Sequence, residues 1–499
     1  MTPRRPGATL GIDLGTTEVK AGVVTLDGRL LGLGRRRYPT AMDPVEGRAE
    51  QDPEAWWAGI AGAIHDALAA GGDRGELLGL AVDGHGPTLV PTDAAGRATH
   101  PAITWQDRRA TIEAAALAEA TGRSGWGLGI LPAARWLETH EPAAAAATRW
   151  YLNTWEALAL RLSGRAAAVV AGAAEPVPTA GLRAAGLRVE RVPAAVPAGS
   201  MLGPLLPDAA RALGLPAGLP VVAGVVDAYA SLHGARMLEA GDALDVGGAA
   251  GGFGLYWDRP IEAAGSFTAP APLPGLWLVG GAMAATGAAL DWFRDDVLGG
   301  RWTTAQLIAE AAEVPAGAEG LVFLPYLAGE RSPIWDPAAR GAFVGLTLRH
   351  GRAAMTRSIL EAAAFALRHV AGGISDAGGR PRVMRVCGGP AQSEAWNRIK
   401  ADATGLPVEV PRILETAAVG SAILAAVGIG AHPDLASAIR AMAVMDHAIE
   451  PRPSTAAAYD AAFAAYLAVY PALASATAGS SPATDGGETG APVRIEAVA

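Results

Sequence analysis

Residues 10–20 (LGIDLGTTEVK) combine a carboxylate, a tight turn and a cation in one short stretch. An apolar strand ends at Asp13, and Gly15 then begins a turn with two hydroxyl residues, Thr16 and Thr17. Backbone N–H groups in such a glycine turn can converge on an anion. Lys20 follows where a cation could meet the same anion. The pattern predicts a β-hairpin folded around a phosphate. Asp27-Gly28 closes the second strand of this hairpin with a strong hairpin signal.

This stretch differs from the Walker phosphate-binding loop. The G-x-x-x-x-G-K-[ST] pattern is missing from it, and its glycine leads into a strand rather than a helix. An ordinary edge hairpin with a glycine turn is the alternative interpretation of these residues alone. The rest of the chain has to decide between the two.

Two later strands also deliver polar residues. The buried strand predicted at 77–82 ends in the polar, glycine-rich run 83–87 (DGHGP), and another at 219–226 delivers Asp227 before a helix at 228–237. Loops at the carboxyl ends of buried strands are where α/β sheets place ligands. These segments are therefore candidates for one shared site.

The strand, glycine turn and returning strand at the start of the chain recur about 230 residues later. A strand at 243–246, a glycine-rich turn at 247–252 and a returning strand at 253–257 predict a second hairpin. A strand at 383–386 then runs through Gly388 and Gly389 into a helix with Ser393 as its N-cap. The recurrence predicts two related domains, and duplicated folds place a ligand between the copies.

Composition limits the function classes. A chain of 499 residues with 51% hydrophobic residues is long enough for two large domains. The net charge of −9, with no stripe of Lys and Arg, argues against a nucleic-acid binder. The single cysteine, Cys387, excludes an internal disulfide and a cysteine zinc site. We expect a cytoplasmic protein, because the sequence shows neither a signal-peptide pattern nor a long uninterrupted apolar run.

Seven motifs, in order, resemble the FGGY family of carbohydrate kinases, and most of all its xylulokinase branch. They are GIDLGTTEVK from residue 11, AEQDPEAWW at 49–57, GHG at 84–86, VVAGVVDA at 221–228, FLPYLAGERSP at 323–333, RGAFVGLTLRHGRAAMTRSILEAAAFALR at 340–368 and CGGPAQSEAWNRIKADATGLPVEVP at 387–411. The resemblance implies an α/β protein with two actin-like (ribonuclease-H-like) domains and an interdomain cleft. We expect a sugar-binding domain at 1–237, an ATP-binding domain at 238–474 and a disordered tail at 475–499.

The resemblance also assigns roles. Asp227 matches the catalytic base that accepts the proton of the sugar hydroxyl, although a helix N-cap is the alternative role. Asp13 matches the residue that holds Mg²⁺, usually through water. The ATP-binding positions are Thr16, Thr17, Lys20, Gly247, Gly248, Gly287, Gly388, Gly389 and Ser393.

Sugar binding is expected at Gly84, His85, Asp107, Asp227 and Ala228. Gly84 and His85 match a Met-His pair that contacts the sugar, and a glycine in place of Met leaves room there; a structural histidine is the alternative. Trp105, Asp107 and Arg109 fit a W-x-D-x-R region, where the alternative is an Asp-Arg pair that orders a loop.

Three departures from the family pattern put the substrate in doubt. The second phosphate loop lacks its usual threonine and contains Ala249-Ala250. Ala228 replaces the usual Asn or Gln after the base, and the motif D-x-S-[DN]-A-[SA]-G-T is not recognisable between Ala166 and Gly203.

The leading hypothesis is ATP-dependent phosphorylation of a sugar or polyol hydroxyl, with D-xylulose or a related pentulose as the first candidate. The alternatives are a catalytically weak homologue that binds sugar or nucleotide as a sensor or scaffold and an actin-fold ATPase of the chaperone or acetate-kinase type. We expect ATP, Mg²⁺ and a small sugar as ligands, no nucleic acid and no membrane. The sequence is compatible with a homodimer but does not fix the oligomeric state.

Overall fold

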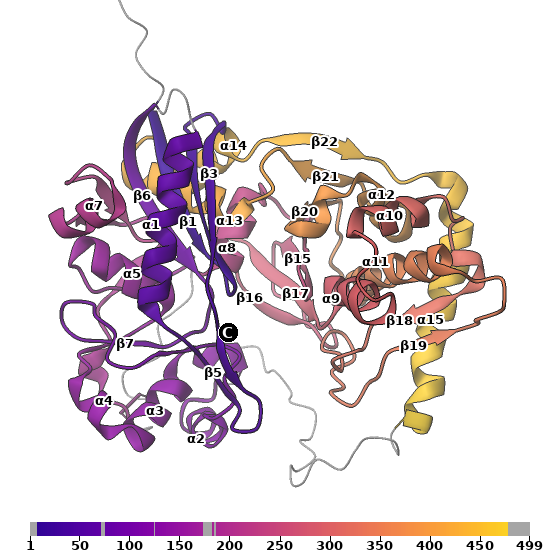
Figure 1. Ribbon diagram of the computed structural model, residues 1–499, viewed down its shortest axis with the longest axis horizontal. Coiled ribbons are helices and arrows are strands. Elements are labelled where there is room, and N and C mark those ends of the chain that lie inside the picture. The colour runs from indigo at the N-terminus through magenta and orange to yellow at the C-terminus, as the bar shows by residue number, and fades with distance from the viewer. Residues whose placement is uncertain (1–6, 71–74, 124, 173–181, 184–185, 478–499) are drawn as a thin grey trace, which may run out of the picture. The chain divides into compact units, whose positions relative to one another are not determined.

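The computed structural model describes residues 7–70, 75–123, 125–172, 182–183 and 186–477 (Figure 1). It divides into two compact units. The first unit comprises Met1–Arg236, Pro272–Pro274 and Glu415–Val444, and the second comprises Met237–Ala271, Gly275–Leu414 and Met445–Ala499.

The first unit is built on a six-stranded sheet. Its strands, in spatial order, are β12 (Met201–Pro204), β13 (Pro220–Val222), β6 (Glu76–Gly84), β1 (Gly7–Leu14), β2 (Glu18–Thr25) and β3 (Leu30–Arg37). β1, β2 and β3 form an antiparallel meander, whereas β6 and β13 run parallel to β1. The hairpin predicted at the start of the chain is therefore confirmed.

The second unit repeats this arrangement in a seven-stranded sheet. Its strands, in spatial order, are β16 (Phe267–Pro270), β17 (Trp277–Met283), β15 (Gly251–Trp257), β14 (Asp242–Val246), β20 (Val383–Cys387), β21 (Val408–Pro411) and β22 (Met445–Ile449). β14 pairs antiparallel with β15 and β15 with β17, while β16 extends this side of the sheet as its edge strand; β20 and β21 run parallel to β14. The predicted recurrence of the opening strand, turn and returning strand is confirmed.

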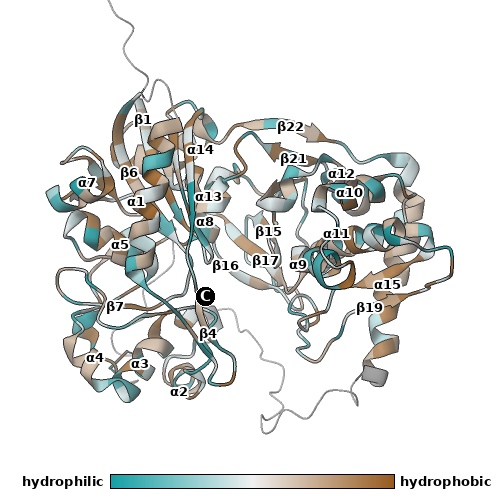
Figure 2. Ribbon diagram, viewed as in Figure 1, coloured by the Kyte–Doolittle hydropathy of each residue, from teal (hydrophilic) through white to brown (hydrophobic). Residues whose placement is uncertain are grey.

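Helices cover both faces of the first sheet at close range. α1 (Pro53–Ala70) packs on the face where glycines of β3 lie against its backbone, while α13 (Thr416–Gly428) and α8 (Asp227–Gly234) pack on the other face. A Cβ on Gly11 would lie 1.8 Å from the Ala418 carbonyl oxygen in α13. This close approach requires glycine at that position. Figure 2 colours these elements by hydropathy, and α13 brings the buried residues Ile423 and Leu424 to the core.

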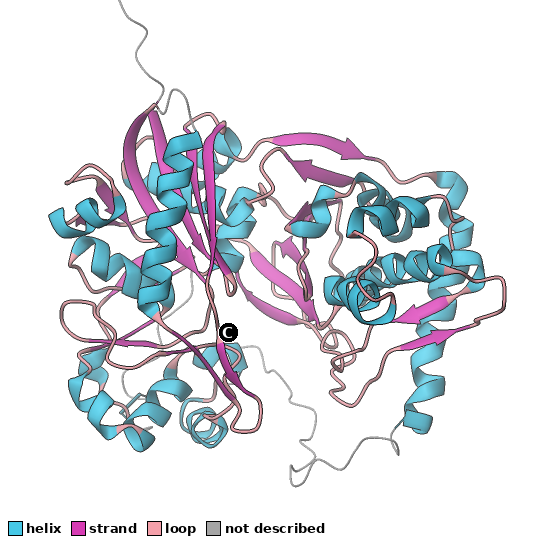
Figure 3. Cartoon of the chain, viewed as in Figure 1, coloured by secondary structure: helices cyan, strands magenta, loops and turns pink. Residues whose placement is uncertain are grey.

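Further helices and strands extend each unit beyond these layers (Figure 3). In the first unit they are β4 (Ala41–Asp43), β5 (Arg48–Gln51), β7 (Val90–Thr92), β8 (Ala102–Ile103), α2 (Thr111–Thr121), α3 (Leu131–His140), α4 (Pro142–Ala147), β9 (Trp150–Leu152), α5 (Thr154–Ser163), β10 (Ala168–Val170), β11 (Ala195–Pro197), α7 (Pro207–Leu213) and α14 (Leu435–Met442). In the second unit they are α9 (Thr286–Trp292), α10 (Thr304–Ala312), β18 (Val322–Leu324), β19 (Ala342–Val344), α11 (Arg352–Asp376), α12 (Glu394–Thr404) and α15 (Ala456–Thr477).

The division into units differs from the predicted domains at one large segment. Glu415–Val444 falls within the range 238–474 that we assigned to the second domain, yet it belongs to the first unit. The reason is packing, because α13 fills the face of the first sheet that the glycines of β1 and β2 leave open. Residues 475–477 of the predicted tail belong to α15, and the rest of that tail lies outside the described residues.

One helical stretch of the described chain, Pro453–Ala474, is long and apolar enough to cross a membrane by length and composition alone. It also has contacts within the second unit. Asp460 pairs with Arg368 at 2.5 Å, and Tyr459 and Tyr466 are buried in the core beside α11. Helices that complete a protein core pass the same length and composition test.

We predict that Gly11→Ala destabilises the protein strongly. The added methyl group would overlap backbone atoms of α13, which cannot rotate away, so we expect a loss of about 3 kcal/mol or more in the free energy of unfolding. Gly372→Ala in α11 is the control, since no atom lies within 4 Å of the position and alanine favours a helix by about 0.5–1 kcal/mol. Denaturant titration compares the two variants, and equal stability would contradict the tight β1–α13 contact.

Candidate functional site

Two aspartates lie side by side at the ends of neighbouring strands in the first unit. Asp13 of β1 is paired in register with Asp83 of β6, and it is also opposite Lys20 of β2. The Lys20 ammonium lies 3.3 Å from the Asp13 carboxylate and 3.7 Å from that of Glu18. Burial opposes the charge on Lys20, but the neighbouring carboxylates outweigh it and raise the pKa of Lys20. The cation that the sequence predicted beside Asp13 is thus held in place.

Asp83 is fully buried, and its carboxyl group holds a proton more readily than an exposed one. Burial, the nearby Asp13 charge and the Asp227 charge raise the pKa of Asp83 well above its usual range, although the Ser421 hydroxyl donates to it at 2.6 Å. Two carboxylates in such contact cannot both ionise cheaply. Asp83 therefore takes up a proton more readily than an exposed aspartate, and in its protonated form it can donate a hydrogen bond to Asp13.

Asp227 approaches these two carboxyl groups from the start of α8. The chain before it runs beside the end of β6, where Gly84 bridges to Val226 and the Gly84 N–H donates to the Val225 carbonyl at 3.4 Å. Burial first and the Asp13 charge second raise the pKa of Asp227 to about 7, although Lys20 and a hydrogen bond from the Ala228 N–H oppose the shift. The residue keeps some solvent access. A half-buried carboxylate with this pKa is suited to accept a proton near neutral pH.

The alternative role of Asp227 as a helix N-cap has limited support. The residue that caps α8 is Val226, and no side chain makes the capping hydrogen bond. The Asp227 carboxylate instead accepts from the next residue, Ala228, at 2.7 Å. The side chain therefore lies at the helix start without performing the usual capping contact.

The turn between β1 and β2 keeps its carbonyl groups inward. The Gly15 N–H donates to the Glu18 carbonyl at 3.1 Å, while the Gly15 carbonyl accepts from the Tyr38 hydroxyl. Thr16 is partly buried and Thr17 is exposed. The predicted phosphate turn thus has an ordered backbone with its hydroxyl residues on the outer side.

The structure places Gly84 and His85 differently from the sequence interpretation. The expectation that Gly84 leaves room for a ligand is wrong, because a Cβ there would lie 2.2 Å from the Thr154 hydroxyl oxygen. His85 is buried, with one ring nitrogen 3.0 Å from the Thr88 hydroxyl and the other 3.1 Å from the Gln51 amide oxygen. Burial lowers the pKa of His85 to about 4. These contacts are those of the structural histidine, the alternative given above.

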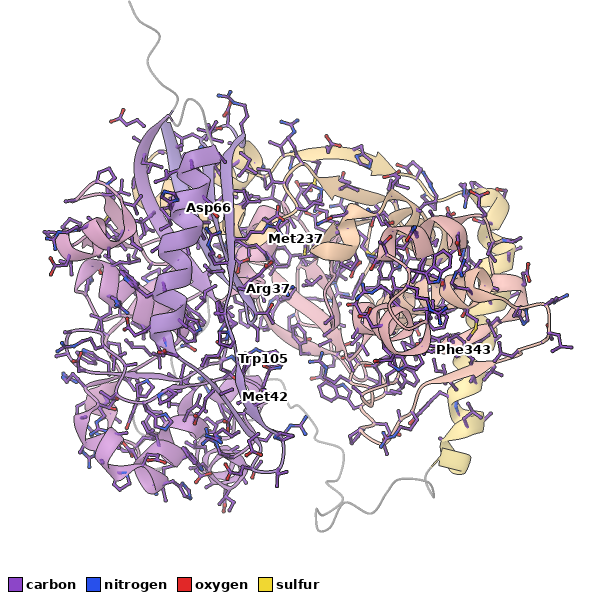
Figure 4. All side chains as sticks on the ribbon, viewed as in Figure 1. Arg37, Met42, Asp66, Trp105, Met237 and Phe343 are labelled. Carbon is purple, nitrogen blue, oxygen red and sulfur yellow. The ribbon has the colours of Figure 1, made fainter. Side chains whose placement is uncertain are left out.

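Asp107 and Arg109 are used for loop order. The Asp107 carboxylate accepts the Ala49 N–H at 2.8 Å and binds Arg109, whose guanidinium also reaches Glu50 at 2.6 Å. Arg109 further stacks over the Trp136 ring at 4.2 Å. Trp105, labelled in Figure 4, is 39% exposed and donates its indole N–H to the Thr16 hydroxyl at 3.1 Å. Of this cluster, Trp105 is the side chain that lies against the turn.

In the second unit, four of the predicted glycines lie together. A Cβ on Gly388, whose φ is +77°, would lie 1.9 Å from the Gly247 carbonyl oxygen. A Cβ on Gly287 would lie 2.2 Å from the Gly248 carbonyl oxygen, which accepts the Gly287 N–H at 3.2 Å. The turn after β14 is therefore in backbone contact with the start of α9 and the end of β20. No side chain other than hydrogen fits at these contacts.

Gly389 and Ser393 complete the predicted set. The space around Gly389 is open to 4 Å, whereas the Ser393 hydroxyl accepts the Trp396 N–H at 3.2 Å as the N-cap of α12. Beneath the turn, Lys400 and Asp245 form a buried ion pair at 2.5 Å. This pair lines a small cavity with room for about one water molecule.

Sequence reasoning missed several residues of these sites. Asp83 was visible as the carboxylate that ends an apolar strand, a signal that equals the one used for Asp13. Gln51, Ser421 and Lys400 carry no such signal, because their partners lie 34, 338 and 155 positions away along the chain. In the described ranges no group of three or more His, Cys, Asp or Glu side chains is arranged to hold a metal ion.

Comparison with known proteins decides the family. Residues 8–176 match the N-terminal domain model of the FGGY family of carbohydrate kinases, and residues 248–429 match its C-terminal domain model. The chain is 32% identical over 421 residues to xylulose kinase from Escherichia coli (strain K12), which covers 79% of this chain and 84% of the relative. The chain belongs to the FGGY family of carbohydrate kinases.

Other FGGY proteins are similar over still more of the chain. Glycerol kinase from Allorhizobium ampelinum is 30% identical over 489 residues, covering 89% of this chain and 95% of the relative. The crystal structure of xylulose kinase from Rhodospirillum rubrum superposes with a TM-score of 0.79 at 31% identity, covering 94% of this chain and all of the other. The two units are thus actin-like domains of an FGGY kinase, and the chain is a phosphotransferase that acts on a sugar or polyol with ATP.

We predict that His85 stays neutral from pH 5 to pH 8. Burial penalises the charged imidazole, and a neutral ring satisfies both contacts by donating to the Gln51 amide oxygen and accepting from the Thr88 hydroxyl. Two-dimensional NMR of ¹⁵N-histidine protein checks this, with His85→Gln to assign the signal. The exposed His447, whose pKa its carboxylate neighbours raise, provides the titrating control. Titration of His85 near pH 6.5 would contradict the buried network.

Proposed function

We propose that this FGGY kinase transfers the γ-phosphoryl group of ATP to a hydroxyl of a pentulose, with D-xylulose as the first candidate and related sugars or polyols next. The observation that carries the proposal is the cluster in the first unit. It joins a carboxylate with a pKa of about 7 (Asp227), a carboxylate paired with a cation (Asp13 and Lys20) and a turn with outward hydroxyl residues. Phosphoryl transfer needs these three functions: a proton acceptor, charge neutralisation and positioning.

Asp227 is the base in this proposal. The acceptor hydroxyl oxygen forms a bond to the γ-phosphorus while the bond from that phosphorus to the bridging oxygen of ADP breaks, and the hydroxyl proton passes to the Asp227 carboxylate. A pKa near 7 balances two requirements, since the group must be ionised at working pH yet basic enough to accept the proton. The hydrogen bond from the Ala228 N–H fixes the orientation of the carboxylate.

Asp13 and Lys20 are proposed to neutralise the phosphates. The Asp13 carboxylate, at the end of β1, is an oxygen ligand of the kind that Mg²⁺ prefers, and this ion keeps several waters and needs one or two carboxylates plus phosphate oxygens. Asp13 would hold such an ion, which supplies charge for the transferring group. Lys20, Thr16 and Thr17 would bind phosphate oxygens directly. In the second unit, Gly247, Gly248, Gly287, Gly388, Gly389 and Ser393 are proposed to line the nucleotide.

The sugar is proposed to bind beside Trp105, Asp227 and Ala228. Ala228 is exposed and brings no polar side chain, so it selects by shape rather than by hydrogen bonds. Gly84, His85 and Asp107 are proposed to act by shaping this end of the sheet, because their polar groups are engaged within the protein. The names of the relatives, xylulose kinase and glycerol kinase, support a small polyhydroxylated molecule as the acceptor. We place the reaction in the cytoplasm, where ATP is regenerated.

We predict that the phosphoryl acceptor is found among pentuloses, pentitols, glycerol and gluconate when these compounds are tested as a panel. With MgATP we expect acceptor-dependent ADP release, largest for a pentulose, and little ADP release without acceptor. A coupled pyruvate kinase assay measures it, and ³¹P NMR of the product identifies the phosphorylated hydroxyl. The kinase proposal fails if no member of the panel raises ADP release although the protein binds ATP.

Asp227→Asn is predicted to reduce turnover about 10²- to 10⁴-fold, because the amide cannot accept the proton. In the unchanged enzyme kcat/KM should rise with pH through about 7 and then level, with about a tenth of the plateau at pH 6, since only the ionised base is active. Asp208→Asn is the matched control, as an exposed aspartate in the first turn of α7. A variant that keeps more than a tenth of the turnover excludes Asp227 as the base.

A further inference from the structure

Gln51, at the end of β5, is buried and bonds in four directions. Its amide oxygen lies 3.0 Å from the Trp56 indole nitrogen and 3.1 Å from a ring nitrogen of His85. Its amide nitrogen lies 2.8 Å from the Thr16 carbonyl oxygen and 2.6 Å from the Thr40 hydroxyl. An indole N–H can only donate, so the amide oxygen must face Trp56. This fixes the amide nitrogen as the donor to Thr16.

The same constraint sets every proton in the neighbouring bonds. The His85 nitrogen that faces the Gln51 oxygen must carry a proton. Because burial keeps the imidazole neutral, the other ring nitrogen accepts from the Thr88 hydroxyl. The Thr88 oxygen in turn accepts the Trp105 backbone N–H at 3.2 Å, and the Trp105 indole donates to the Thr16 hydroxyl. The bonds form a closed ring: Thr16, Gln51, His85, Thr88 and Trp105.

The ring acts on the turn after β1. The Gly15 carbonyl is held by the Tyr38 hydroxyl, the Thr16 carbonyl by Gln51 and the Thr17 carbonyl by the Tyr38 N–H at 3.3 Å. The N–H of each peptide points opposite to its carbonyl, so three inward carbonyls turn the following N–H groups outward. Within the described part of the chain, the N–H groups of Thr16 and Thr17 donate to no protein group. Two outward N–H donors beside Lys20 suit a phosphate.

We propose that Gln51 and His85 are positioning residues that hold this turn with its N–H groups directed at the phosphates of ATP, and that the ring ties the turn to Trp105 beside the sugar. This rests on the proposed function. Gln51 draws the Thr16 carbonyl inward, His85 fixes the Gln51 amide, and Thr88 connects both to the Trp105 loop. The imidazole of His85 therefore serves the nucleotide through the turn.

The test is ATP affinity measured by calorimetry without acceptor, at a temperature where circular dichroism shows each variant folded. Gln51→Met keeps the side-chain length and removes both amide functions. We expect at least tenfold weaker ATP binding, and a larger increase in KM for ATP than in KM for the sugar, relative to the unchanged enzyme. Thr9→Val is the control, since it removes a buried hydroxyl that donates 2.8 Å to the Ala422 carbonyl on the same sheet, away from the ring. It should lower the melting temperature without changing the ATP Kd.

A second variant keeps the proposal testable if Gln51→Met does not fold. Trp105→Phe retains an aromatic ring at a partly exposed position and removes the bond to Thr16, and it should weaken ATP binding at least threefold. Because the ring works as a unit, the double variant Gln51→Met/Trp105→Phe should lose at least threefold less affinity than the product of the single losses. In the double variant Thr9→Val/Trp105→Phe, the loss of ATP affinity should equal the product of the two single losses.

The outcomes separate this inference from the proposed function. Wild-type protein that binds no ATP would overturn both. Wild-type binding that Gln51→Met or Trp105→Phe leaves within twofold would overturn the positioning role alone, as would a fully multiplicative double variant.

Discussion

The contact between Asp13 and Asp83 is the constraint on which the first unit depends. Register places two carboxyl groups next to each other at the ends of β1 and β6, in surroundings that exclude most water. Ionising both would be costly, so the pKa of Asp83 is raised and the charge of Asp13 needs a cation. Lys20 supplies that cation from β2, and the Ser421 hydroxyl of α13 donates a hydrogen bond to Asp83. The chemistry proposed for Asp227 depends on the same balance, because the Asp13 charge helps to raise its pKa.

This balance explains why the first unit needs a segment from near the end of the chain. Ser421 lies on α13, which reaches the sheet only because the facing residue of β1 is Gly11. Gly420 makes an equally close contact with α8, since a Cβ there would lie 1.9 Å from the Ala230 carbonyl oxygen. Small residues thus let α13 pack on both β1 and the helix that begins with Asp227. A division of the chain by sequence order alone misses this arrangement.

Sequence reasoning was strongest where a strand pattern and a turn signal coincide. The hairpin at Asp13 to Lys20, its recurrence at Gly247 and the Ser393 cap follow from local chemistry, and the structure contains all three. Side-chain environment was harder to predict. Nothing near Gly84 in the sequence indicates that Thr154 fills the space beside it, and nothing near His85 indicates that Gln51 and Thr88 occupy both its ring nitrogens. Such contacts depend on how distant segments pack.

The two glycine turns show how one topology can be fixed in two ways. In the first unit the carbonyls of the turn are held by side chains, Tyr38 and Gln51, so the turn can carry threonine hydroxyls on its outer side. In the second unit the turn is held by backbone contacts with Gly287 and Gly388, and the chain has alanine where hydroxyls are usual in the family. A turn fixed by its own backbone keeps its N–H directions without side-chain help. The missing threonine hydroxyl in the loop that contains Ala249 and Ala250 therefore removes one hydrogen bond of about 0.5–1.5 kcal/mol. The backbone bonds from Gly287 and Ala288 to this turn do not depend on that hydroxyl.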